Sequence, residues 1–330
     1  MCNLTLYICF KLRVAPDVYD ETPTQVTTWL TIIPKISILV LLLELESGLS
    51  INSIIELPVY ENIISQFNIA SNIFDVTYNT SYVLKMLLLI SSLFSLIVGT
   101  VVGLAQTRIK RLLAYSTISH IGFILLALAI NTEQSIDSFI FYILQYSITN
   151  LNIFLIVIAL GFIIHKEGIK IYSNSNNVYF FDFDIRYITA FKGQFFANPI
   201  LSLSLAVALF SMAGVPPLLG FFSKQFVLYS AVQSGYYFIS FVAIIASVIS
   251  ASYYLRIIML LFTENGSIET NVSTLTLGTE NVGHSNNESI LSNFHSFLIS
   301  TITLSILLFI FKPTLLLNST QLLSLSLFNY

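Results

Sequence analysis

The sequence predicts an all-α membrane protein: a polytopic bundle of transmembrane helices, one of which is broken at Pro216-Pro217. Hydrophobic residues make up 55% of the 330 residues and charged residues only 9%, against about 25% charged residues in a soluble domain. The mean hydropathy is +0.83. Long apolar stretches recur along the chain, and they are predicted to be helices because lipid cannot hydrogen-bond the backbone.

Seven stretches approach or exceed the roughly 20 residues that cross about 30 Å of hydrocarbon. Polar connections separate some of them, and the apolar, serine-dotted tail 314–330 is expected at the membrane interface. Residues 4–12 resemble the remnant of an earlier span, so the chain is treated as one partial membrane domain over 1–330. The expected spans are 26–46, 83–105, 112–130, 138–164, 200–232 (broken), 236–262 and 294–311, and the main loops are 47–82, 166–198 and 263–293.

The distribution of basic residues predicts the orientation. Alternate threading of the spans leaves Lys312 on one side and Lys85 at a membrane edge. By the positive-inside rule the opposite, basic side faces the cytoplasm or the mitochondrial matrix. That side receives Arg13, Arg108, Lys110, Arg111, Lys166, Lys170, Arg186 and Lys192.

Three lysines lie where a membrane protein rarely carries one, and they are the candidate residues for proton transfer: Lys11, Lys35 and Lys224. A cation at the bilayer centre costs roughly 2.5 kcal/mol or more, and such residues usually line an ion or proton path. Lysine suits this task because a buried ammonium can give up its proton, which a guanidinium cannot. The pattern therefore indicates the movement of protons.

Lys35 lies near the middle of the span 26–46, directly after Pro34. Proline removes one helical hydrogen bond and frees a carbonyl about one turn earlier. An ammonium beside that opening can meet polar backbone or water. The alternative is a lysine whose long stem carries the charge to the membrane surface.

Lys224 follows the break in the span 200–232, where Gly214 and Gly220 flank the two prolines. Broken helices within membranes are tolerated where they line a cavity or are buried in protein. A lysine one turn past such a break is a natural proton-holding group. The alternative is that Pro216 marks a turn between helices and leaves Lys224 at a surface.

His120, in the span 112–130, is a further candidate for proton transfer because imidazole gains and loses a proton near neutral pH. A hydrogen-bonded structural histidine fits the sequence equally well. Gln145, Asn150 and Asn152 in the next span are expected either to hold water for a relay or to join helices by hydrogen bonds.

Nothing in the sequence indicates a cofactor bound by this chain. The glycine-rich phosphate-binding patterns are absent, and the four histidines are too scattered for a metal cluster. The two cysteines, Cys2 and Cys9, are too few and too close to the terminus to frame a disulfide or a metal site. The expected partner of the apolar chain is the lipid bilayer, and no nucleic acid is expected.

Several motifs together resemble the NADH-ubiquinone oxidoreductase chain 2 family, the antiporter-like membrane subunits of respiratory complex I. The resemblance implies that Lys11, Lys35 and Lys224 line a polar axis along the membrane midplane. It also implies proton translocation in the mitochondrial inner membrane, with NADH oxidation and ubiquinone reduction in partner subunits and no redox centre here. The motifs are Asp17-Val-Tyr-Asp, Thr22-Pro-Thr-Gln-Val-Thr, Pro34-Lys-Ile-Ser-Ile-Leu, residues 106–123 (QTRIKRLLAYSTISHIGF) and Gly214-Val-Pro-Pro-Leu-Leu-Gly-Phe-Phe-Ser-Lys.

The sequence departs from the family pattern in two places. The family has several helices before the position of Lys11, one with a glutamate that pairs with this lysine, and a short stretch is missing after Pro16. The expected start is therefore truncated. Two other functions stay open: a subunit of a multi-subunit cation/proton antiporter, and a structural membrane fragment that does not conduct.

Overall fold

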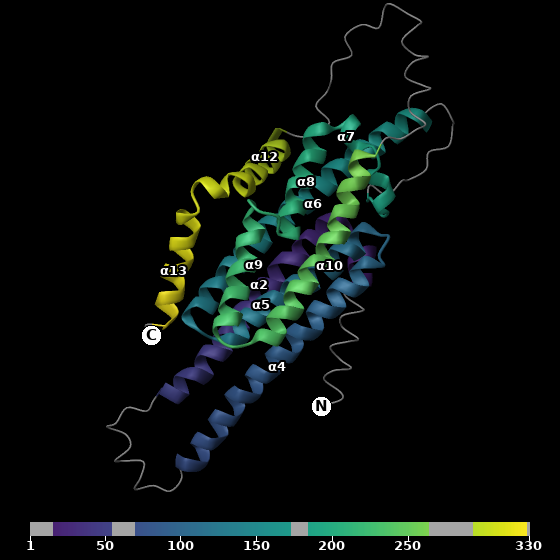
Figure 1. The fold of residues 1–330 in the computed structure, drawn as a ribbon. Helices are drawn as coiled ribbons and strands as arrows, with labels where there is room; N and C mark the ends of the chain where they lie inside the picture. Colours follow the sequence, from purple (N-terminus) through teal and green to yellow (C-terminus); the bar gives the residue numbers. More distant parts are fainter. Residues whose placement is uncertain (1–15, 55–69, 173–183, 264–292, 329–330) are drawn as a thin grey trace, which may run out of the picture.

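The computed structural model describes residues 16–54, 70–172, 184–263 and 293–328, which form a bundle of helices (Figure 1). Within these residues there is no β-strand, and the one isolated bridge joins Arg108 to Tyr187. The all-α prediction is confirmed. The helices are α2 (Thr24–Ile54), α4 (Ala70–Leu104), α5 (Ile109–Ile130), α6 (Glu133–Tyr172), α7 (Gln194–Ala197), α8 (Pro199–Ala213), α9 (Leu219–Gln233), α10 (Tyr237–Phe262), α12 (Asn293–Leu308) and α13 (Thr314–Phe328), with short 3-10 turns at Ile188–Phe191 and Phe309–Phe311.

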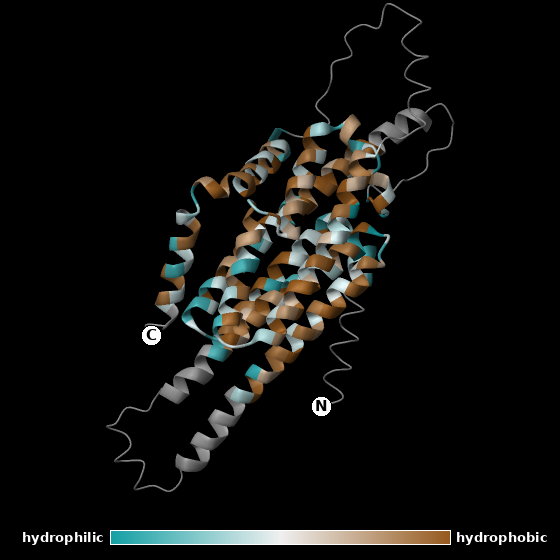
Figure 2. Cartoon of the chain, in the orientation of Figure 1, coloured by the Kyte–Doolittle hydropathy of each residue, from teal (hydrophilic) through white to brown (hydrophobic). Residues whose placement is uncertain are grey.

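The helices are long and apolar enough to make the chain a multi-pass membrane protein. Figure 2 shows apolar residues along the helices, with hydrophilic ones concentrated toward the turns and the helix ends. Helices α8 and α9 have 15 residues each and follow one another along the chain as two shorter pieces. Six segments meet the length and hydropathy of a membrane span: Thr24–Glu46, Tyr82–Leu104, Ile109–Ile130, Glu133–Ile164, Tyr237–Phe262 and Asn293–Phe311.

The expected connections 47–82 and 166–198 are wrong in part, because helices occupy their ends. Helix α2 continues to Ile54, α4 begins at Ala70, and α6 continues to Tyr172. Hydropathy marks the apolar part of a helix, whereas backbone hydrogen bonds continue into water beyond it. Residues 264–292, most of the third expected connection, and residues 4–12 lie outside the described residues.

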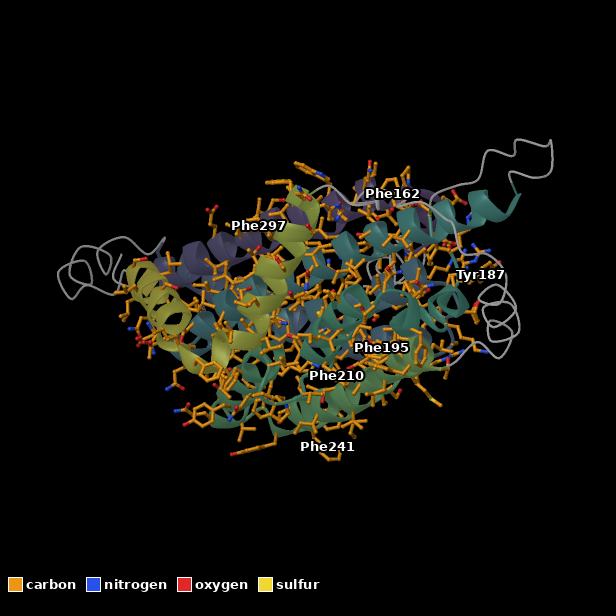
Figure 3. The ribbon with its side chains drawn as sticks, turned by 90° about the horizontal axis from the view of Figure 1, so that it is seen from above. Phe162, Tyr187, Phe195, Phe210, Phe241 and Phe297 are labelled. Carbon is orange, nitrogen blue, oxygen red and sulfur yellow. The ribbon has the colours of Figure 1, made fainter. Side chains whose placement is uncertain are left out.

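Helix α5 runs through the centre of the bundle, and 89% of its span is buried. Its close approach to α4 depends on glycine: a Cβ atom at Gly99 would lie 2.6 Å from the backbone nitrogen of Ser119, and one at Gly122 would lie 2.6 Å from Oγ of Ser95. Small residues allow helix backbones to approach closely in membranes. The large apolar side chains on the outer faces, such as Phe241 and Phe297, point away from the bundle (Figure 3).

The break between α8 and α9 is built from glycine and proline. Gly214 has a left-handed backbone, and the amides of Gly214 and Val215 donate to the carbonyls of Ser211 and Phe210. This is the Schellman ending of a helix. At the start of α9, a Cβ atom on Gly220 would overlap the carbonyl of Ser211. The two half-helices therefore meet through backbone.

Ion pairs tie together the end of the bundle where α2 and α5 begin. Arg108 and Arg111 pair with Asp20, and Arg111 also pairs with Asp17 at 3.0 Å. Lys110 pairs with Asp184 at 2.6 Å. Asp17 and Asp20 belong to one sequence motif, and Arg108 and Arg111 belong to another that is far away along the chain. The ion pairs therefore join the two motifs into one structural unit.

Candidate functional site

Lys224 is buried at the helix break, with 7% of its surface exposed. Its Nζ donates to the carbonyls of Met212 and Ala213, at 2.9 Å each. In an unbroken helix these two carbonyls would accept from the residues four positions later, which here are Pro216 and Pro217 and have no N–H. The lysine therefore supplies the donors that the double proline removes.

The space for this lysine depends on Gly214. A Cβ atom there would lie 3.1 Å from Cδ and 3.4 Å from Nζ of Lys224. The glycine thus serves the left-handed turn and the close passage of the lysine stem. On its other side, the ammonium lies 5.8 Å from the ring centre of Phe123, within the range of a cation–π contact.

Lys35 is half-buried on α2, next to the kink-forming Pro34. Its Nζ lies 3.5 Å from the hydroxyl of Tyr146 on α6 and 5.5 Å from the ring centre of Tyr19. The hydroxyl of Tyr19 donates to the carbonyl of Leu30 at 3.4 Å. This carbonyl is the one that Pro34 deprives of its helical donor, four residues back. Tyr19 therefore contacts both the freed carbonyl of Leu30 and the lysine.

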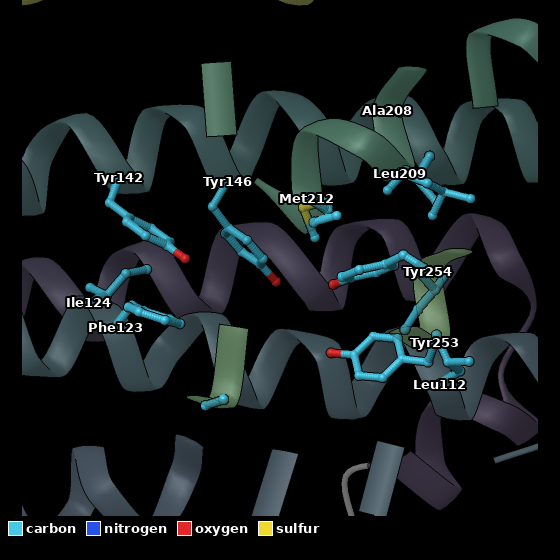
Figure 4. Packing of buried hydrophobic residues seen from close by; sticks show 14 of the residues in the cluster. Leu112, Phe123, Ile124, Tyr142, Tyr146, Ala208, Leu209, Met212, Tyr253 and Tyr254 are labelled. Carbon is cyan, nitrogen blue, oxygen red and sulfur yellow. The ribbon is translucent and has the colours of Figure 1, made fainter. Parts of the chain in front are cut away.

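His120 is buried and touches two tyrosine hydroxyls. Its Nδ1 lies 2.8 Å from Oη of Tyr142, and its Nε2 lies 3.1 Å from Oη of Tyr254. A neutral imidazole donates through one nitrogen and accepts through the other. The two tyrosines, from α6 and α10, therefore take opposite roles toward the ring. Figure 4 shows the hydroxyls of Tyr142, Tyr146 and Tyr254 directed into the space between the helices.

Aromatic rings connect the two lysines through His120. The ring of Tyr146, which meets Lys35, lies 5.7 Å from the ring of His120. The ring of Tyr142 stacks on Phe123 at 5.9 Å, and Phe123 lies under Lys224. The structure thus brings Lys35, His120 and Lys224 into one cluster.

Amide side chains of α6 flank this cluster. Oε1 of Gln145 accepts from the hydroxyl of Ser223 at 3.3 Å, one residue before Lys224. Nδ2 of Asn150 donates to the hydroxyl of Tyr146 at 3.4 Å. Asn152 is fully buried, and neither of its side-chain polar atoms has a partner in the described part of the chain. Gln145 and Asn150 therefore join helices or support the tyrosines.

Two features of the cluster were not apparent from the sequence. The tyrosines that contact Lys35 and His120 carry no motif of their own, since a buried tyrosine in an apolar span is indistinguishable from core. The carbonyls that accept from Lys224 could have been identified from the sequence, because they lie four residues before the two prolines.

Lys11 lies outside the described residues. In the part of the chain that the structure describes, neither Lys35 nor Lys224 forms an ion pair.

The groups outside the membrane spans hold well-defined charges. Burial raises the pKa of the Tyr19 phenol, so this hydroxyl keeps its proton and stays a donor. Burial also acts to raise the pKa of Asp184, but hydrogen bonds from Lys110 and Thr24 outweigh it and leave the pKa below its usual range. A hydrogen bond from Arg108 to Asp20 raises the pKa of that guanidinium. Arg108 and Asp184 therefore both carry their charges at neutral pH.

No group of three or more histidine, cysteine, aspartate or glutamate side chains that could hold a metal occurs among the described residues. The cluster instead combines two amines, an imidazole and phenols, which are groups that hold and pass protons. Buried lysines at helix irregularities inside a bundle of membrane-length helices define an antiporter-like membrane protein.

Comparison with known proteins gives the family. The model of the family described as "NADH:quinone oxidoreductase/Mrp antiporter, TM" matches residues 63–250, more than half of the chain. The matched region includes His120 and Lys224. The chain belongs to this family.

The relatives by sequence carry related names. NADH-ubiquinone oxidoreductase chain 2 of Rhizopus oryzae is 47% identical over 95% of this chain and 55% of its own length, and that of Metridium senile is 33% identical over 78% and 54%. NADH-quinone oxidoreductase subunit N of a Wolbachia strain is 34% identical over 79% and 47%. The chain spans about half the length of the curated relatives it matches.

Solved structures share the fold. A chain of the membrane-bound sulfane sulfur reductase, an archaeal respiratory membrane complex, superposes with a TM-score of 0.67, covering 95% of this chain and 51% of that one at 19% identity. A chain of respiratory complex I from Thermus thermophilus gives 0.51, covering 71% and 45% at 24% identity. These identities support the architecture alone.

Proposed function

We propose that this chain translocates protons as a membrane subunit of an NADH:ubiquinone oxidoreductase, respiratory complex I. The observation that carries the proposal is Lys224, a buried amine held by two backbone carbonyls with no carboxylate paired to it in the described residues. An amine in such a place can hold a proton and release it. Lys35, His120 and Lys11 are proposed as further proton-transfer residues. In this proposal the tyrosines of the cluster lie between Lys35 and His120 on one side and Lys224 on the other.

The names of the sequence relatives support the assignment to complex I. In this proposal NADH oxidation and ubiquinone reduction take place in partner subunits, and this chain binds neither molecule and carries no redox centre. The chain functions in the mitochondrial inner membrane with its ion-paired, basic end toward the matrix. Its partners are the other membrane subunits of the complex.

The test is the replacement Lys224→Arg in the assembled complex, reconstituted in sealed vesicles. Arginine keeps the charge and several N–H donors, so it can still serve the carbonyls of Met212 and Ala213, but it does not give up its proton. The number of protons moved per pair of electrons is expected to fall, while assembly and binding of NADH are retained. The change Lys312→Arg, at an exposed position, is the matched control and should pump normally.

Two results would reject the proposal. Normal proton transfer by the Lys224→Arg complex would show that Lys224 only fills space. Failure of the unmodified chain to co-purify with NADH-oxidising subunits would reject the assignment to complex I. A sodium-dependent proton flux without electron transfer would favour a cation/proton antiporter subunit instead, and no flux at all would favour a non-conducting fragment.

A further inference from the structure

A pocket of about 460 Å³ opens at the end of the bundle opposite the ion-paired end. Its walls come from the start of the span in α4, from the turn between α5 and α6, and from the turn between α9 and α10. Its volume lies within the roughly 300–1,000 Å³ of small-molecule sites. The polar and charged lining residues are Lys85, Thr132, Glu133, Gln134, Gln233, Ser234 and Tyr236.

The pocket presents one positive and one negative group. Lys85 lies three residues inside the span that begins at Tyr82, and its Nζ is 5.5 Å from the ring centre of Tyr236. Glu133 is exposed in the first turn of α6. Because a carboxylate and an ammonium line the same pocket, a simple anion is a poor ligand for it.

The surroundings of the pocket are apolar. Val83 and Met86 on α4, and Phe238 and Phe241 on α10, are exposed on the outside of the bundle, with Phe238 70% exposed. Helices α4 and α10 pack against one another, and Phe241 points outward from α10 (Figure 3). The lining residues lie at the ends of membrane spans, where headgroups meet water. A polar pocket beside an apolar face at this depth matches the two parts of a lipid.

We propose that this pocket binds the headgroup of a zwitterionic phospholipid with a primary ammonium, namely phosphatidylethanolamine. The phosphate accepts from the ammonium of Lys85, and the ethanolamine ammonium donates to the carboxylate of Glu133. Tyr236 holds Lys85 in place through its ring, so that ring is not available to a trimethylammonium group. The acyl chains lie along the apolar outer face of α4 and α10.

Native mass spectrometry of the full chain tests this proposal, with phosphatidylethanolamine, phosphatidylcholine and phosphatidylglycerol of identical acyl chains. The unmodified chain should bind phosphatidylethanolamine about tenfold more tightly than phosphatidylcholine, because only the primary ammonium donates hydrogen bonds to a carboxylate. Glu133→Gln should remove this preference, and Lys85→Gln should weaken binding of both lipids by about tenfold. The matched controls Glu21→Gln and Lys312→Gln, both at exposed positions outside the pocket, should change neither.

Three outcomes would overturn the proposal, and all of them need only the unmodified chain. Equal affinity for phosphatidylethanolamine and phosphatidylcholine would remove the role of the primary ammonium. Tighter binding of phosphatidylglycerol would make the site an anion site. Soluble phosphoethanolamine that binds as tightly as the lipid would make it a site for a free zwitterion and not for a membrane lipid.

Discussion

At the scale of single residues, carbonyls that lack a helical donor because of proline bind polar side chains. Lys224 donates to the two carbonyls freed by the double proline, and Tyr19 donates to the one freed by Pro34. The sequence predicted the kink at Pro34 and the break before Lys224, and it placed both lysines near them. It did not predict that Tyr19 would donate to Leu30, because that contact needs the segment before α2 to fold back on the helix. A freed acceptor can be read from the sequence, whereas its donor depends on tertiary structure.

The change Tyr19→Phe tests this role. It removes the donor to the carbonyl of Leu30 and keeps the ring beside Lys35. The unfolding free energy of the full chain in lipid nanodiscs should fall by about 1 kcal/mol, the usual contribution of one hydrogen bond. Tyr229→Phe, at a position 62% exposed on α9, should stay within about 0.5 kcal/mol of the unmodified chain. Equal losses from both changes would show that the bond to Leu30 does not matter.

At the scale of helices, hydropathy predicted the apolar spans, and the structure extends three of the helices into the expected connections. The sequence could not name the face that lies opposite Gly99 and Gly103 on α4. That face belongs to α5 for Gly99 and to Tyr253 of α10 for Gly103. The sequence predicted only that Gly220 flanks the break. In the structure, its missing side chain lets α9 begin against the carbonyl of Ser211.

Gly220→Ala should therefore separate the two half-helices. The added Cβ meets backbone that cannot rotate away, so we expect a loss of about 3 kcal/mol in unfolding free energy, the upper end for overpacking. Gly235→Ala is a useful comparison, because this glycine has a positive φ of 84° and no atoms within 4 Å of an added Cβ. It should cost about 1 kcal/mol from backbone strain alone. A smaller loss for Gly220→Ala than for Gly235→Ala would contradict the close contact.

At the scale of the whole molecule, charge separates the two ends of the bundle. The count of basic residues predicted one basic side, but the structure pairs three of those residues with aspartates from other segments. Lys110, with 3% of its side chain exposed, bonds to Asp184 and to the carbonyl of Thr22. Asp184 also accepts from the backbone nitrogen and hydroxyl of Thr24, the first residue of α2. Pairing over such sequence distances cannot be read from composition.

The pair of Lys110 and Asp184 makes stability depend on acid pH. Because the pKa of Asp184 is lowered in the folded chain, its contribution is complete above about pH 4, near the ordinary pKa of aspartate, and is lost as the pH falls through the folded value. Asp184→Asn should cost about 3 kcal/mol at pH 7, since it leaves a buried ammonium without its partner. The same variant should lose less stability than the unmodified chain on acidification.

Asp17→Asn is the control for that measurement. Asp17 pairs with Arg111, but its side chain is 56% exposed, and exposed ion pairs contribute about 0–1 kcal/mol. Chemical unfolding between pH 3 and pH 7 compares the three proteins. A loss from Asp17→Asn as large as that from Asp184→Asn would show that total charge, and not the buried pair, holds this end together.

The way Lys224 is held has a consequence for the geometry of proton release. An ammonium has three N–H donors, and a neutral amine has two. Two carbonyls accept from this nitrogen, so both hydrogen bonds survive when the third proton leaves. A lysine held by a carboxylate would lose its ion pair at that step. In its neutral form Lys224 has two N–H donors for two carbonyl acceptors. The same arrangement of α8 and α9 therefore accommodates the lysine before and after the proposed release of its proton.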